Sequence, residues 1–328
     1  MGAGSPSARR VPGWLAGLLL AALLTAPALA EYPERTVRIV VGYPAGGPTD
    51  VVARVVAERL AQMNGKPFIV DNKPGASSLI ATAEVVRAAA DGYTLLMAAS
   101  NHASNPAILK SIPYRTQGDL AGIMLVAEGP HVLVVHPDAP FTDVAGLVAY
   151  AKANPGKLAY SSSGSGGSVH FAGAMLEEAA GIQLTHVPYK GAAPAIQDLV
   201  GGQVQIAMAT LASVSGHVRS GRLRMLAVAA PARVQGFDVP TFAELGYPGV
   251  SLAAWAGLLA PAATPRLVLD KLSRQITQAL GQPEVRGRLE ALGMVPVGAG
   301  PAEFDALIAR EIELYDRIAK ARGITADP

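Results

Sequence analysis

The sequence predicts an α/β protein of two domains, each with a doubly wound, mainly parallel sheet. Short apolar runs rich in Val, Ile and Leu alternate along the chain with longer segments whose apolar residues recur at helical spacing. After a first set of such elements, the same alternation begins again near residue 131. The chain has 328 residues, half of them hydrophobic, which is enough for two cores of ordinary size.

The first set of elements begins with a β-branched strand at 37–41, followed by a glycine-rich turn. A helix is predicted from Val51 to Asn64, with Thr49 or Asp50 as its N-cap and Gly65 as its stop. The next elements are predicted to be a strand, a helix and a strand, at 68–70, 81–90 and 93–98. This β-α-β-α-β order is typical of a parallel sheet.

The second set repeats the pattern, and a mainly helical C-terminal third follows it. The expected strands are 131–135, 158–162, 184–187, 204–208 and 223–228. The expected helices are 144–153, 169–180, a helix from about Pro194, and then 266–280, 283–292 and 301–321.

Two proline-containing turns are the expected crossings between the domains. Gly129-Pro130 interrupts the β-prone run 123–135, and the turn 246–249 precedes the apolar run 250–259. We therefore expect a discontinuous first domain, residues 31–130 plus 250–328, around an inserted second domain, residues 131–249.

Residues 1–30 have the layout of a secretory signal peptide. Arg9 and Arg10 form the positive region, an apolar run follows at 11–26, and Ala28-Leu29-Ala30 is a small-x-small cleavage site. The apolar run is shorter than the ~20 residues that span a bilayer, which argues against a permanent anchor. We expect export to the periplasm with residues 1–30 removed, by the general or the twin-arginine route.

The charge balance and composition exclude several classes of function. Removing Arg9 and Arg10 leaves 25 basic residues against 25 acidic ones, so no basic surface is expected for nucleic acid or an anionic membrane. The absence of cysteine excludes disulfides, cysteine nucleophiles and zinc–thiolate sites. The six histidines show no paired-ligand spacing such as H-E-x-x-H, so neither a metal nor a cofactor is expected.

Two glycine-rich segments, each between a predicted strand and a predicted helix, are the main candidates for binding. We call them loop 1, residues 44–50, and loop 2, residues 163–168. A helix start carries unpaired N–H groups and the positive end of the helix dipole, and glycine lets a ligand approach the backbone. Since ligands bind at the carboxyl ends of strands in such sheets, we expect the loops to face each other across a cleft that holds an anion.

The motifs of nucleotide-binding and hydrolytic sites do not fit these loops. Val169 stands where the dinucleotide fingerprint requires its third glycine, and no glycine loop ends in Gly-Lys-Ser or Gly-Lys-Thr. A serine hydrolase is disfavoured, because the chain has no G-x-S-x-G elbow and His170 follows the serines of loop 2 too closely, with no evident acid. His170 is instead expected to pack or form a hydrogen bond beneath loop 2.

Three further side chains are weaker candidates for the cleft. His102 follows a strand end, Lys190 offers a cation to an acidic ligand, and Trp255 lies beside the second crossing. Each also has an ordinary interpretation, as a polar loop residue, a solvated lysine and a core tryptophan respectively.

Several short segments along nearly the whole mature chain occur in a specific order. They are Tyr32-Pro33, Pro44 to Asp50, Asn72 to Ala76, Asp91 to Leu96, Asn105-Pro106, Val187 to Gly191, Asp198 to Val204, Leu226 to Val228 and Pro240 to Gly246. In this order and spacing the chain resembles the Bug-type periplasmic solute-binding proteins, the receptor components of tripartite tricarboxylate transporters.

The resemblance implies a type II-like periplasmic binding-protein fold, with two domains that close on a small carboxylate in the cleft between them. It also implies that backbone N–H groups and ordered water at residues 46–50 and 163–167 hold the carboxylate. Gly167 departs from the family pattern, which often has Ser or Thr there, and Ala209-Thr210 stands where many members have aspartate. The second departure favours a plain carboxylic acid over an amino acid.

The predicted ligand-binding residues come from both loops and from the strand ends around them, and no residue is assigned to catalysis. They are Gly46, Gly47, Pro48, Thr49, Asp50, Ser100, Asn101, His102, Ser163, Gly164, Ser165, Gly166, Gly167, His170, Tyr189, Lys190 and Trp255.

Two functions fit these observations. The first is a monomeric receptor that captures a small carboxylate and delivers it to the large and small membrane subunits of a transporter. The alternative is a periplasmic signalling protein that presents a carboxylate to a membrane sensor, and the neighbouring genes would separate the two. The sequence leaves open whether the ligand is an amino acid, a dicarboxylate, a tricarboxylate or an aromatic acid.

Overall fold

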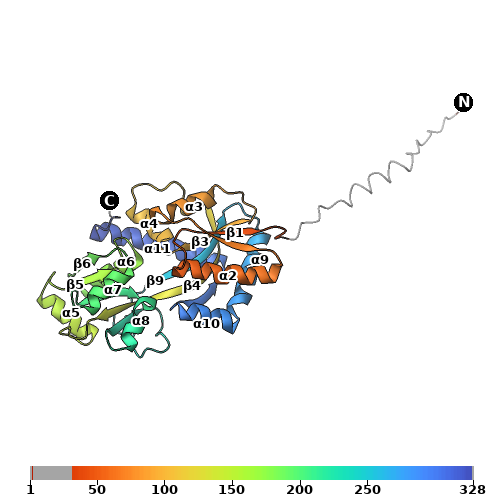
Figure 1. The fold of residues 1–328 in the computed structure, drawn as a ribbon. Coiled ribbons are helices and arrows are strands. Elements are labelled where there is room, and N and C mark those ends of the chain that lie inside the picture. Colours follow the sequence, from red (N-terminus) through yellow and green to blue (C-terminus); the bar gives the residue numbers. More distant parts are fainter. Residues whose placement is uncertain (1, 3–31, 327–328) are drawn as a thin grey trace. The chain divides into compact units, whose positions relative to one another are not determined.

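The computed structural model describes Gly2 and residues 32–326, and the compact unit that begins at Arg35 contains all the helices and strands discussed here (Figure 1). The predicted signal peptide lies outside the described residues. The strands are β1 (Val37–Val41), β2 (Phe68–Asn72), β3 (Thr94–Ala99), β4 (Leu120–Val135), β5 (Ala159–Ser162), β6 (Thr185–Pro188), β7 (Ile206–Thr210), β8 (Arg224–Ala229), β9 (Ala253–Pro261) and β10 (Val295–Ala299). The helices are α2 (Pro48–Asn64), α3 (Leu79–Val86), α4 (Asn101–Ile108), α5 (Val144–Ala153), α6 (Ser168–Ala180), α7 (Ala192–Val200), α8 (Leu211–Arg219), α9 (Arg266–Leu280), α10 (Pro283–Ala291) and α11 (Pro301–Arg322), with the 3₁₀ turn η1 (Ala76–Ser78) before α3.

The sheet is mixed, with a parallel group of strands at each end. The strands pair in the order β2-β1-β3-β9-β4-β7-β5-β6, and β8 and β10 also pair with β4. β1 is parallel to β2 and β3, and β5 is parallel to β6 and β7, as the two β-α-β sets predicted. The strands that join these groups are antiparallel, since β9 pairs with both β3 and β4, and β4 pairs with β7. The predicted α/β fold class is confirmed.

Strand β4 links the two groups of strands. Its residues 120–130 pair with β9, and its residues 131–135 pair with β7 and β8. The expected interruption at Gly129-Pro130 is wrong, because both residues continue the ladder with β9. Proline is tolerated at an edge position or a ladder end, and Pro130 forms the last pair of that ladder. The domain bounds predicted from this position stay a prediction.

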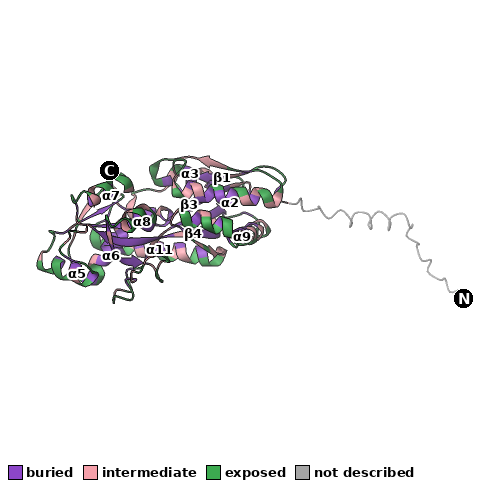
Figure 2. Ribbon diagram, turned by 60° about the horizontal axis from the view of Figure 1, so that its bottom comes forward, coloured by how far each residue is buried: buried purple, intermediate pink, exposed green. Residues whose placement is uncertain are grey.

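A large apolar core connects both groups of strands, and a separate apolar cluster lies around β7, β8, α7 and α8. The buried residues follow the strands and the inner sides of the helices (Figure 2). Helix α11 packs against α4, β4 and α6, so the C-terminal helix covers both groups. Among residues 32–326, no helix has the combined length and apolarity needed to cross a membrane.

Most predicted elements are found within a few residues of their expected bounds, and two of the exceptions concern the binding region. Helix α2 begins at Pro48 with Gly47 as N-cap, earlier than predicted, because proline is well suited to the first helical position. Helix α4 was not predicted, since it is short and contains Pro106. Strand β10 was also not predicted.

Candidate functional site

The two glycine loops have the same backbone conformation where they enter their helices. Gly46 and Gly166 have φ values of 85° and 69°, a left-handed conformation that favours glycine. The following residues, Gly47 and Gly167, are the N-caps of α2 and α6, with φ/ψ of −74°/165° and −79°/160°. Loop 1 and loop 2 are therefore two copies of one structural device, each ending at a helix start.

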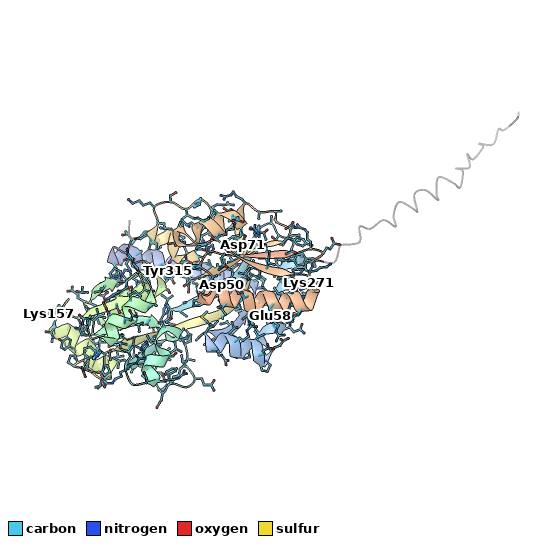
Figure 3. All side chains as sticks on the ribbon, viewed as in Figure 1. Asp50, Glu58, Asp71, Lys157, Lys271 and Tyr315 are labelled. Atoms are coloured by element: carbon cyan, nitrogen blue, oxygen red, sulfur yellow. The ribbon has the colours of Figure 1, made fainter. Side chains whose placement is uncertain are left out.

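Loop 1 is held by Asp50, which lies in the first turn of α2 and is 1% exposed (Figure 3). Its Oδ2 accepts hydrogen bonds from the N–H of Gly46 at 2.8 Å and from Nε of Arg54 at 2.9 Å, and its Oδ1 accepts one from Nδ2 of Asn72 at 2.8 Å. Burial alone would raise the pKa of Asp50, but the hydrogen bonds from Arg54, Gly46 and Asn72 lower it below its ordinary value. The Asp50 carboxylate is buried and supports the loop, so its side chain makes no ligand contact here, and the predicted contact through the backbone N–H groups of residues 46–50 stays a prediction.

Loop 2 is held in the same way by His170, whose Nδ1 accepts a hydrogen bond from the N–H of Gly166 at 3.1 Å. Burial and the neighbouring His186 lower the pKa of His170 to about 3, so its ring is neutral at ordinary pH, as an accepting nitrogen requires. The His170 and His186 rings stack with their centroids 3.6 Å apart. His170 thus lies beneath loop 2, as expected from the sequence.

Sequence reasoning missed the contact between Ser162 and His186. Nε2 of His186 lies 2.7 Å from Oγ of Ser162, because β5 and β6 are neighbouring parallel strands. A serine hydroxyl beside an imidazole is also how a nucleophile and its base are arranged. Here, however, Ser162 is 1% exposed and its Oγ lies 3.1 Å from the carbonyl oxygen of Gly164. The pair supports the start of loop 2 and gives a substrate no access to the hydroxyl.

Helix α4 brings the two loops together. At its start, Oδ1 of Asn101 accepts a hydrogen bond from the hydroxyl of Tyr43, the residue before loop 1. One turn later, the hydroxyl of Ser104 donates to the carbonyl oxygen of Gly166 in loop 2 at 3.3 Å. Residues one turn apart are separated by roughly 5 Å along a helix axis, so both loops lie beside the same turn of α4. Ser104 was missed because α4 itself was not predicted.

The segment after β6 forms part of the same region. The N–H of Tyr189 donates to the carbonyl oxygen of Ser162 at 3.0 Å, and the N–H of Gly191 donates to that of Ser163 at 3.2 Å. The Tyr189 hydroxyl donates to Asp198 at 2.7 Å, and this bond raises the pKa of Tyr189 to about 12. Lys190, between Tyr189 and Gly191 in the sequence, is exposed and stays a candidate cation beside loop 2.

Two predicted cleft residues are instead part of the core. His102 is 3% exposed and stacks against Tyr114, and its burial lowers its pKa to about 4. Trp255 is 2% exposed, its Nε1 donates to Glu311 at 2.8 Å, and its ring meets Phe304 edge-on. The prediction that they line the cleft is wrong, because tertiary packing covers both rings. Ser100, at 6% exposed, serves as the N-cap of α4.

A separate cavity of about 800 Å³ lies between α8, the segment 230–237 and α10. It contains none of the predicted ligand-binding residues. Within residues 32–326, His, Asp and Glu side chains form no group of three or more arranged to hold a metal ion.

A family model described as the tripartite tricarboxylate transporter family receptor matches residues 52–324. The chain belongs to this receptor family. Among its relatives, BugT of Bordetella pertussis is 36% identical over 304 residues, which are 92% of this chain and 93% of BugT. These matches confirm the resemblance to Bug-type solute-binding proteins.

Two solved structures of similar proteins contain a carboxylate. An R. palustris protein with adipate is 32% identical, with a TM-score of 0.77 over 90% of this chain and all of that chain. MatC from Rhodopseudomonas palustris, with bound malate, is also 32% identical, with a TM-score of 0.72 over 88% of this chain and 99% of that chain.

Proposed function

We propose that this receptor captures a small carboxylate between loop 1 and loop 2 and delivers it to the membrane subunits of a tripartite transporter. The observation that carries the proposal is the repeated device of a left-handed glycine, a glycine N-cap and a helix start. The hydrogen bonds of α4 with Tyr43, the residue before loop 1, and with Gly166 in loop 2 support the nearness of the two copies of this device.

Backbone groups at these helix starts are suited to a carboxylate. The N–H groups of Thr49 and Val169 lie in the first turns of α2 and α6, where no intrahelical acceptor exists. Charge-assisted hydrogen bonds to such groups are strong, and the helix dipole adds to them. Neither loop contains a basic residue, so recognition needs no buried arginine. The adipate and malate bound to the similar proteins are of this ligand class.

Release and capture of the ligand require the two parts of the chain to move relative to each other. The predicted hinges are the crossing at residues 129–130, within β4, and the crossing at Tyr247-Pro248. Small-angle scattering should therefore show a smaller radius of gyration with ligand than without it. An unchanged radius with ligand demonstrably bound would contradict the proposed closure.

The cellular setting follows from the same proposal. The chain is exported to the periplasm, loses residues 1–30, and acts there as a monomer. It captures the ligand and presents it to the large and small membrane subunits of the transporter.

Ligand binding is tested by thermal denaturation of refolded protein, so that no carried-over ligand masks the effect. A carboxylate at about 100 times its Kd should stabilise the protein by ~2.7 kcal/mol. At roughly 2–4 °C per kcal/mol, Tm should rise by about 5–10 °C. The panel includes adipate, malate and citrate, with sugars, cations and nucleotides as comparisons. A rise with these comparisons and none with carboxylates would overturn the proposal.

A glycine variant shows where the carboxylate binds. Gly47→Val keeps an ordinary backbone conformation, and the added Cβ meets its nearest neighbour only at 3.6 Å. The side chain obstructs the helix start, so the Tm rise should disappear while the unliganded Tm stays near that of the wild type. Gly300→Val is the matched control, because Gly300 is also an N-cap with ordinary φ before a proline, on α11.

Substitution of Gly46 or Gly166 is less informative. Both have positive φ, and a Cβ on Gly166 would lie 2.5 Å from Cδ1 of Ile108. Such variants strain the loop whether or not it binds ligand.

A further inference from the structure

The turn that follows β2 has a strained backbone, and we call its residues 75–78 the β2 turn. Ala76, Ser77 and Ser78 have φ values of 45°, 51° and 69°, in the left-handed region. That region is unfavourable for residues that carry a Cβ, so three such residues in succession are rare. A strained backbone persists only where its surroundings hold it, and such strain is common at ligand-binding sites. The β2 turn is therefore a candidate for a role in binding.

Two side-chain amides and one close contact hold the β2 turn in place. The carbonyl oxygen of Ser77 accepts hydrogen bonds from Nδ2 of Asn101 at 2.6 Å and from Nδ2 of Asn105 at 3.0 Å. Ser78 lies so close to Gly42, the residue after β1, that a Cβ on Gly42 would be 1.8 Å from Oγ of Ser78. The β2 turn is thus fixed to the end of β1 on one side and to α4 on the other.

Strand register places the β2 turn at the same edge of the sheet as loop 1. β1 is parallel to β2, and Val41, the last residue of β1, pairs with Asn72, the last residue of β2. β3 is also parallel to β1 and ends at Ala99, just before α4 begins at Asn101. Loop 1, the β2 turn and the start of α4 therefore all lie outside the carboxyl ends of neighbouring parallel strands, where ligands bind in such sheets.

One face of α4 connects the β2 turn with loop 2 as well. Besides its bond to the turn, Asn101 accepts the hydroxyl of Tyr43, the residue before loop 1. Ser104, one turn later, donates to the carbonyl oxygen of Gly166 in loop 2. Residues three or four apart on a helix lie on one face, so Asn101, Ser104 and Asn105 project from the same side of α4. The β2 turn therefore lies beside the start of loop 1 and beside loop 2.

The exposed surface of the β2 turn is small and uncharged. Gly75, Ala76 and Ser77 are exposed, and the Ser77 hydroxyl forms no hydrogen bond with another part of residues 32–326. Loop 1 and loop 2 offer N–H groups at helix starts, whereas this surface offers a methyl group, a hydroxyl and no charge. Ligand sites combine a few polar groups that orient the ligand with surfaces of this kind that contact the rest of it. The β2 turn therefore suits the carbon chain of an acid.

We propose that the β2 turn is a third wall of the binding site, and that Ser77 limits the length of the carbon chain that the receptor accepts. The inference rests on the proposed function and adds a specificity-determining residue to it. The contacts with β1 and α4 keep Ser77 at one distance from both loops, and selection by length requires such a fixed distance.

Two substitutions of Ser77 change the space at this wall without adding backbone strain. Ser77→Asn adds bulk, and asparagine tolerates the left-handed conformation better than other residues with a side chain. Ser77→Gly removes the side chain and also suits that conformation. Both variants should therefore keep an unliganded Tm at or above that of the wild type. Ser111→Asn is the matched control, because Ser111 is also exposed, has an ordinary φ and lies beyond the far end of α4.

The probes are straight-chain dicarboxylates from succinate to suberate, with affinity measured by calorimetry on refolded protein. Ser77→Asn should shift the preference toward shorter acids, and the longest acid that the wild type binds should lose about tenfold or more in affinity relative to the shortest. Ser77→Gly should shift the preference toward longer acids, and Ser111→Asn should behave as the wild type. A general disturbance of the site would weaken all the acids alike, so the ratio of affinities reports the wall itself.

The outcomes distinguish this inference from the function on which it rests. A wild type that binds no carboxylate at all overturns both. A wild type that binds carboxylates, with the same length preference in both Ser77 variants, overturns only the inference. Binding of other carboxylates but of none in this straight-chain series also overturns only the inference.

Discussion

Glu311 should make the stability of this protein fall as the pH rises from about 5 to 9. This glutamate lies in α11, is 6% exposed, and accepts the indole N–H of Trp255 at 2.8 Å. Burial raises its pKa from 4.5 to about 8, and the neighbouring Glu128 adds to the rise, while the hydrogen bond from Trp255 opposes it. Near neutral pH the folded protein therefore holds Glu311 mainly protonated.

The sign and size of the effect follow from proton linkage. Between the unfolded pKa of 4.5 and the folded pKa of about 8, the folded state binds more protons than the unfolded state. The stabilisation that Glu311 gives the folded state is complete below the unfolded pKa of 4.5, and it is lost as the pH rises through the folded pKa of about 8. A pKa rise from 4.5 to about 8, at ~1.36 kcal/mol for each pKa unit, corresponds to a loss of about 4–5 kcal/mol.

The perturbation is Glu311→Gln, which keeps an oxygen to accept the Trp255 N–H and cannot ionise. Urea denaturation at pH 5 and pH 9 should give nearly equal free energies of unfolding for the two proteins at pH 5. At pH 9 the variant should be more stable by several kcal/mol. Glu313→Gln, an exposed position on the same helix, is the control and should show no such divergence. A difference between Glu311→Gln and the wild type that stays constant with pH would refute the reasoning.

Three further predictions concern the backbone, the core and processing. Ser77 has φ 51° and an exposed side chain. Ser77→Gly should relieve ~1–2 kcal/mol of left-handed strain, while the greater entropy of glycine in the unfolded chain takes back ~0.4–1 kcal/mol of this gain. Tm should therefore rise by a few degrees, and a lower Tm would contradict this. Gly257→Ala should destabilise by about 1–3 kcal/mol in chemical denaturation, because its Cβ would lie 2.1 Å from Cζ of the buried Phe304; unchanged stability would show that the ring has room to move. N-terminal sequencing of exported protein should begin at Glu31, and a membrane-bound chain that retains Met1 would disprove the cleavage.

The sequence by itself determined the features that depend on neighbouring residues. Apolar residues at helical spacing placed the helix at 266–280 at its observed bounds, and short β-branched runs located the parallel strands of both groups within a few residues. The glycine loops were also recognisable, because a strand that ends in glycines before a helix start is a local pattern. The family resemblance added the ligand class, which the carboxylates in similar solved structures support.

Only the tertiary structure decided which side chains support the loops and which are buried. Asp50 reaches Asn72, Ser162 reaches His186, and Ser104 reaches Gly166, 62 residues further along the chain. His102 follows a strand end and Trp255 lies beside a predicted crossing, and both positions would suit a cleft, yet packing covers both side chains. Burial and hydrogen bonding depend on which distant segments of the chain come into contact, and local periodicity carries no information about those tertiary contacts. For the same physical reason, the shared backbone of the two loops and the different charges beneath them became visible only in the folded chain.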